Sequence, residues 1–137
     1  MPTGALERLN SSINNSATIA EIAGADIPGP AHKAVMYDTN GNVVVATSGD
    51  VAIGTVLSSS LDPIKSGQGV HIAIKYIVLM EVGGAVAKGD LVTVNATGQA
   101  QTAEEGDFIF GRAFEAATAA GQVVQVQINQ MGYMPTA

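Results

Sequence analysis

The sequence predicts an all-β fold: a small β-sandwich or barrel built from two similar halves and preceded by an extended N-terminal arm. Three observations favour this fold. Valine- and isoleucine-rich segments alternate with glycine and asparagine turns from Lys33 onward, these segments recur at a constant offset, and the first 30 residues differ in composition from the rest. A chain of 137 residues can bury about two-thirds of its unfolded surface, so one core needs no disulfides.

The N-terminal region, residues 1–30, is rich in Ser, Asn and Ala and ends in Ile27-Pro28-Gly29-Pro30. Asn and Ser favour turns over helix interiors, and the prolines keep the backbone extended. The predicted boundary therefore separates an arm, residues 1–30, from a β-domain, residues 31–137. Ordering the arm costs roughly 1–2 kcal/mol per residue, and its sparse apolar side chains do not offset this cost.

We therefore expect the arm to be mobile in the free chain and to become ordered on a partner. An extended segment can pair with an exposed strand edge and place alternate side chains in grooves. The alternative is that the segment packs on its own β-domain as a short helix or strand. The arm residues expected to contact the partner are Leu6, Leu9, Ile13, Ile19, Ile22 and Ile27.

Strands are predicted from β-branched runs that are bounded by Gly, Asn, Asp or Ser. Asn40-Gly41 is a strong hairpin signal, because both residues tolerate a positive φ. In the last run, Val124 and its apolar neighbours alternate with glutamines, as expected for a strand with one buried and one wet face. The predicted strand regions are 43–45, 70–82, 91–94 and 123–128.

An internal repeat supports the two-halves prediction. A shift of 57 positions aligns residues 33–57 with residues 90–114, and the repeated units extend to 33–74 and 90–128. Apolar positions agree across the shift, so the alternation of side chains between strand faces is kept. The matched pairs include Val35 with Val92, Gly41 with Gly98, Ala46 with Ala103, Gly54 with Gly111, Ile53 with Phe110 and Leu57 with Phe114.

Glycine and Gly-Asp positions in the repeat are interpreted as structural turns, because a positive φ favours glycine and Asp side chains bond turn backbones. The predicted turn residues are Gly41, Gly49, Asp50, Gly54, Gly89, Asp90, Gly98, Gly106, Asp107 and Gly111.

Composition argues against several classes of protein. The net charge is −6 and the six Lys and Arg residues are scattered singly, so nucleic acid is not an expected partner. No apolar run is long enough to span a membrane, and the N-terminus lacks the pattern of a secretory signal. We therefore expect synthesis in the cytoplasm and no membrane partner. Cysteine is absent, which removes thiolate chemistry.

No catalytic, cofactor or metal site is predicted. His32 and His71 lie in no recognisable motif, and Ser58-Ser59-Ser60 lacks the flanking glycines of a nucleophile elbow. The turn Gly67-Gln68-Gly69 precedes a strand, so it offers no helix N-terminus to a phosphate. A hard cation could bind among the acids of residues 104–107, but their spacing matches no calcium loop and favours a solvated turn.

One segment favours a different class of protein. Residues 83–91 resemble the V-x-x-G-D-x-L turn of biotinyl and lipoyl carrier domains, in which a lysine at a hairpin tip is modified. Lys65 is the one lysine in a comparable turn, but the flanking methionine or aspartate of those domains is missing. The carrier alternative predicts a mass adduct on a lysine.

A stronger resemblance follows from motifs in a fixed order. These are Gly84-Ala85-Val86-Ala87-Lys88-Gly89-Asp90, Asn95-Ala96-Thr97-Gly98, Phe110-Gly111-Arg112-Ala113-Phe114-Glu115-Ala116-Ala117 and Ala119-Ala120-Gly121, followed by a valine-rich strand. In this order the chain resembles the phage capsid cement, or decoration, protein family over roughly residues 33–128. The long N-terminus and the tail from Met131 depart from the family pattern.

The resemblance implies a homotrimer that binds the major capsid protein on the outer surface of a phage head and stabilises the shell. It implies no catalytic residue and no cofactor, and it makes the arm the candidate capsid-binding segment. The acidic charge agrees with an external position, since packaged DNA repels an acidic chain. Alternatives are another virion subunit, such as a tail-tube or head-fibre protein, and less favourably the carrier domain.

Overall fold

The computed structural model describes residues 17–47 and 51–136 and contains ten β-strands and no helix within those ranges. The all-β prediction is therefore confirmed, and no helix among these residues could span a membrane. The strands are β1 (Thr18–Ile22), β2 (Ala34–Tyr37), β3 (Val43–Val45), β4 (Gly54–Val56), β5 (Gly69–Ala73), β6 (Ile77–Glu81), β7 (Leu91–Val94), β8 (Ala100–Thr102), β9 (Phe108–Ala113) and β10 (Val123–Tyr133).

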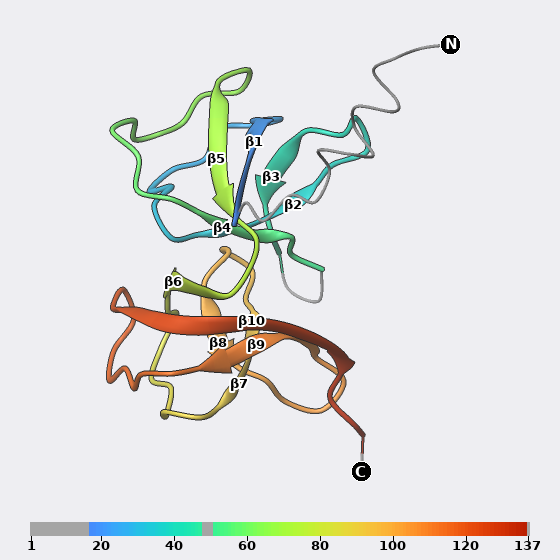
Figure 1. Cartoon of the computed structure of the whole chain (residues 1–137), viewed down its shortest axis with the longest axis vertical. Helices are drawn as coiled ribbons and strands as arrows, with labels where there is room; N and C mark the ends of the chain where they lie inside the picture. Colours follow the sequence, from blue (N-terminus) through green and yellow to red (C-terminus); the bar gives the residue numbers. More distant parts are fainter. Residues whose placement is uncertain (1–16, 48–50, 137) are drawn as a thin grey trace.

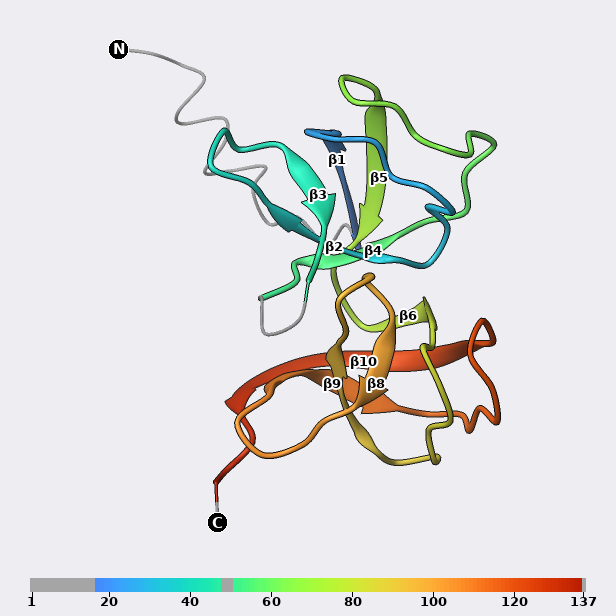
Figure 2. The ribbon, with the colours of Figure 1, turned by 180° about the vertical axis from the view of Figure 1, so that it is seen from behind.

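The strands form two lobes, one above the other in Figure 1 and seen from behind in Figure 2. The first lobe is a five-stranded antiparallel sheet in the order β1-β5-β4-β2-β3, and the second has the order β6-β10-β9-β7-β8. Each sheet curls until its end strands meet, because parallel bridges join Ala23 to Val43 and Val82 to Ala100. Each lobe is therefore a small, nearly closed barrel.

The two lobes repeat each other strand by strand. Val35 pairs with Val45 and Gly54 in the first lobe, and Val92 pairs with Thr102 and Gly111 in the second. Both partners are shifted by the 57 positions found in the sequence. The two halves therefore share strand order and register across β2–β4 and β7–β9.

The structure differs from the predicted arm over residues 17–30. β1 pairs with β5 along its whole length, and Ile27 is fully buried, with its backbone bonded to Ile64. The repeat explains the difference, since β1 corresponds to β6 and completes the first barrel. The alternative of a strand packed on its own domain is correct here, while residues 1–16 lie outside the described residues.

The predicted strand region 70–82 is also two strands. β5 ends at Ala73 and β6 begins at Ile77, in different sheets, so residues 74–76 link the lobes. Tyr76 in this link has φ 65, in the left-handed region. The one sequence feature at the break is Lys75, and a single charged residue does not by itself end a strand.

The lobes share part of a core. One cluster lies within the first lobe and includes Ile27, Val35, Ile64 and Ile72. The other surrounds Phe110 in the second lobe and is completed by four buried alanines of the first lobe, Ala34, Ala46, Ala52 and Ala73. We call this junction the waist. Small side chains there let backbones approach, and Ala34 N donates to Gly98 O at 2.8 Å.

The predicted turn residues fall into three groups. Gly41, Gly89, Gly98 and Gly106 have positive φ and lie in turns. Asp90 and Asp107 accept hydrogen bonds from Ala87 N at 3.0 Å and Glu104 N at 2.9 Å, and each bond stabilises the turn in which it lies. Gly54 and Gly111 are not turn residues: they are buried in β4 and β9, where neighbouring backbone leaves no room for a side chain. Gly49 and Asp50 lie outside the described residues.

Candidate interaction surfaces

An exposed apolar surface lies beside β6, on one side of the waist. β6 pairs with β10 along one edge, and its odd-numbered side chains point away from the second core. We call the surface the β6 face; its members and exposed fractions are Leu57 (38%), Ile77 (52%), Leu79 (46%) and Val123 (41%). Exposed aliphatic side chains gathered on one face are typical of a protein-binding surface.

The β6 face crosses the boundary between the lobes. Leu57, Ile77 and Leu79 line one depression of about 240 Å³, together with His32 and Ser58. Leu57 follows β4 of the first lobe, whereas Ile77 and Leu79 belong to the second. A partner on this face would therefore contact both lobes at once.

A second apolar surface is a groove of about 470 Å³ that also crosses the waist. We call it the waist groove; its lining residues are Ile19, Tyr37, Val51, Ala52, Ile53, Ile74, Ile128 and Gln130. Among these, Tyr37 and Val51 are 45% and 49% exposed. The Tyr37 hydroxyl donates to the Glu21 carboxylate, and this hydrogen bond raises the pKa of Tyr37.

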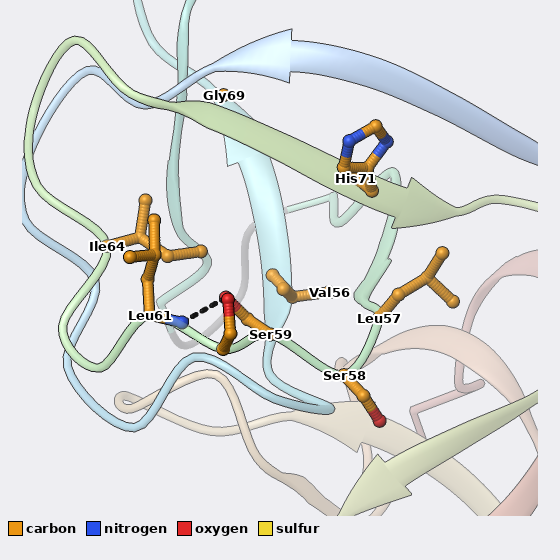
Figure 3. Close-up of a pocket in the computed structure, with 9 residues that line it drawn as sticks. Val56, Leu57, Ser58, Ser59, Leu61, Ile64, Gly69 and His71 are labelled. Carbon is orange, nitrogen blue, oxygen red and sulfur yellow. Dashed lines mark hydrogen bonds between the residues drawn. The ribbon is translucent and has the colours of Figure 1, made fainter.

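A third hollow, of about 290 Å³, contains Ser58, Ser59, Ser60 and His71 (Figure 3). The fold thus brings together two groups that the sequence analysis treated separately. Ser59 Oγ accepts from Leu61 N at 3.0 Å, while the Ser58 hydroxyl and the His71 ring point in different directions. This is a turn geometry, not a hydrogen-bonded nucleophile and base.

A charged cluster joins the lobes near the β6 face. Lys33 Nζ lies 2.9 Å from Glu81 Oε2, and both side chains are largely buried. The same oxygen accepts from Gln99 Nε2 at 2.6 Å, and Glu81 N donates to His32 O at 3.1 Å. Lys33 also donates to Gly29 O at 2.9 Å. First-lobe groups thus meet the carboxylate and backbone of β6.

The pKa values in this cluster respond to burial and charge. Burial by itself would raise the pKa of Glu81, but hydrogen bonds from Lys33 and Gln99, with the Lys33 and His32 charges, lower it. The pKa of His32 is lowered mainly by burial, against the attraction of Glu81. Both pKa values are lowered, so folding favours the ionised form of Glu81 and the neutral form of His32. The stability that each shift adds is present at neutral pH and is lost as the pH falls.

Acidification is therefore expected to remove the difference in stability between the wild type and Glu81→Gln. At neutral pH the variant removes the carboxylate that forms the ion pair with Lys33 and should have the lower Tm. Because the pKa of Glu81 is depressed, the wild-type advantage is present above about pH 4.3 and fades below it. Thermal unfolding from pH 7 to pH 3 measures this. Glu104→Gln, at an exposed turn, should follow the wild type, and a gap for Glu81→Gln that does not change with pH would contradict the expectation.

The residues predicted to bind a partner are only partly available in the structure. Ile22 is 48% exposed, Ile19 lines the waist groove, and Ile27 is buried. Leu6, Leu9 and Ile13 lie outside the described residues. The acids at 104–107 form the expected turn, and Lys65 lies 3.8 Å from Asp26 at an exposed position.

Sequence reasoning missed the β6 face. The available signal was the run Tyr76–Met80, whose side chains are all apolar although only one face of a strand contacts the core. In such a run, two adjacent apolar residues cannot both be buried on a one-sided sheet. One of the two alternating sets of side chains, of which Ile77 and Leu79 form one, could thus have been predicted to lie on the surface.

The chain thus consists of two curled all-β lobes with apolar side chains on exposed surfaces, and such surfaces are typical of proteins that bind other proteins. A family model described as phage cement protein matches residues 59–128, just over half of the chain. The chain therefore belongs to the phage cement protein family. It is a structural protein of the phage virion and is located at the capsid surface.

A solved structure supports the same architecture. The head fiber gp8.5 N base in bacteriophage phi29 is similar with a TM-score of 0.67 and 17% identity, over 87% of this chain and 98% of that chain. At this identity the similarity establishes the fold. No curated protein matches the chain. Membership of this family argues against the carrier-domain alternative, in which the exposed Lys65 would be the modified lysine.

Proposed function

We propose that the protein binds the major capsid protein on the outer surface of a phage head, as a homotrimer, and stabilises the shell without catalysing a reaction. Membership of the cement family is the observation that carries this proposal. The two apolar surfaces at the waist are of the kind through which a chain contacts other proteins or further copies of itself. The net charge of −6 agrees with an external position.

The absence of catalysis is supported by the serine and histidine pocket. Ser59 is bonded within its own turn, and the imidazole of His71 does not face the Ser58 hydroxyl. A nucleophile needs a base within hydrogen-bonding reach, and these side chains are not arranged in that way. We therefore assign the pocket no chemical step.

The proposal predicts saturable binding to heads that lack the protein. Purified chain should co-sediment with such heads up to a fixed ratio and raise the temperature at which they release DNA. Cross-linking followed by mass spectrometry should connect it to the major capsid protein. Heads that already carry the protein are the control, because their sites are filled. Failure to co-sediment with bare heads under conditions that preserve them would refute the proposal.

A head-fibre subunit is the second candidate, favoured by the fold shared with the head fiber gp8.5 N base. Electron-microscopy density distinguishes the two. A cement protein gives compact density of about the size of this chain on the shell, and a fibre subunit gives density that projects well beyond it.

A further inference from the structure

The segments that carry the β6 face and part of the waist groove lie on different sides of the waist. In Figure 1, β6 is on the left of the junction, and the segment that leads into β4, residues 51–53, is on the right; Figure 2 reverses both. One surface carries protruding aliphatic side chains, and the other is a hollow lined by isoleucines and Tyr37. The two are therefore different in shape and alike in chemistry.

Charged side chains of residues 17–47 and 51–136 do not line either surface, although Glu21 is bonded to Tyr37 at the groove and Lys33 and Glu81 lie near the β6 face. The described residues that line the groove include no Asp, Glu, Lys or Arg, and the β6 face consists of aliphatic side chains. Two copies of a chain with net charge −6 repel each other over most of their surfaces. The electrostatic repulsion between two copies is therefore smallest when they meet through apolar surfaces, and these two surfaces are apolar.

Comparison of the lobes shows that the β6 face is not required by the fold. By the register of β1 with β5 and of β6 with β10, the equivalents of Ile77 and Leu79 in the first lobe are Thr18 and Ala20. Both are exposed in the same barrel geometry without large apolar side chains. The equivalent of Val123 is Gly69. The large side chains in the second lobe therefore serve something other than barrel formation.

We propose that the β6 face of one copy docks into the waist groove of the next, so that copies associate head to tail and close into a ring. Two different patches on separate sides of a subunit make a heterologous interface, which forms a closed ring when the rotation between copies permits. The inference rests on the homo-oligomer of the proposed function and names the surfaces that build it. Because both surfaces cross the waist, each contact would bridge both lobes.

Two single variants and their mixture test this pairing. Leu79→Asp places a charge on the β6 face, and Val51→Asp places one in the groove; both positions are about half exposed, so the fold should persist. Ala20→Asp, at the repeat-equivalent exposed position of β1, is the matched control. Circular dichroism checks folding, and analytical ultracentrifugation at high micromolar concentration gives the mass.

We expect three chain masses for the wild type and Ala20→Asp, and one for either interface variant, with association weakened by more than about tenfold. An equimolar mixture of Leu79→Asp and Val51→Asp should form dimers, because the intact groove of the first accepts the intact face of the second. Leu79→Lys should behave like Leu79→Asp, which separates loss of apolar contact from added negative charge.

Three results would overturn the pairing: a monomeric wild type, an unchanged oligomer in either interface variant, or a mixture that remains monomeric. Head binding is measured separately. A wild type that associates as expected but does not bind bare heads would refute the proposed function and leave the pairing intact. Heads decorated by a wild type that is monomeric in solution would refute the pairing and leave the proposed binding to heads intact.

Discussion

A chain that lacks residues 2–25 is expected not to fold, whereas one that lacks residues 2–16 is expected to fold and to bind heads poorly. The longer deletion removes β1, which pairs with five residues of β5, and the buried Ala23. It also removes Gly24 N, which donates to Val43 O at 2.8 Å and helps to close the first barrel. The shorter deletion ends before β1.

The two truncated chains separate a structural from a binding role of the N-terminus. Thermal unfolding should show no cooperative transition for the longer deletion and a Tm close to the wild type for the shorter. If residues 1–16 contact the capsid, as we propose for Leu6, Leu9 and Ile13, the shorter deletion should weaken co-sedimentation by at least about tenfold. Normal folding without residues 2–25, or undiminished decoration without residues 2–16, would contradict the respective assignment.

Gly111→Ala is expected to be among the most destabilising single substitutions. A Cβ at Gly111 would lie 2.0 Å from Gln127 O on the adjacent strand β10, and this backbone oxygen cannot move aside as a side chain can. Overpacking of this kind costs about 3 kcal/mol, which lowers the Tm of a domain of this size by roughly 10 °C. Differential scanning calorimetry measures the change.

The repeat offers a second glycine at which the same substitution can be tested, and another glycine serves as the control. Gly54→Ala should have a similar effect, because its Cβ would lie 2.1 Å from Ala73 O in the equivalent strand pair. Gly84→Ala should change little, since no atom lies within 4 Å of the added carbon. A loss at Gly111 no larger than that at Gly84 would show that the backbone can relax there.

The fold was predictable where glycine spacing and apolar alternation repeat. The offset of 57 residues places Gly54 and Gly111 in register, and it holds for every pair in β2–β4 and β7–β9. It does not hold for β1, because β1 and β6 are separated by 59 positions: Thr18 and Ile77 are equivalent. Because the offset changes and the preceding residues are rich in serine and asparagine, the first strand was not predicted and its residues were assigned to the arm.

The interaction surfaces were less predictable than the fold. Exposure of Ile77 and Leu79 depends on which face of β6 meets the core, and a run of apolar residues carries no alternation to decide this. The waist groove is assembled from residues far apart in the chain, such as Ile19 and Ile128. Its existence depends on how one barrel packs on the other, which no local pattern encodes.

The shared core at the waist has a mechanical consequence. If residues 74–76 were the only connection between the two lobes, the lobes would move apart independently under tension. Here Ala34, Ala46, Ala52 and Ala73 are embedded in the core around Phe110, and Lys33 is paired with Glu81. A pull on the two lobes must break these contacts together before the link can extend. The two lobes are thus mechanically coupled, and a force applied to one lobe is transmitted to the other through the shared core and the ion pair.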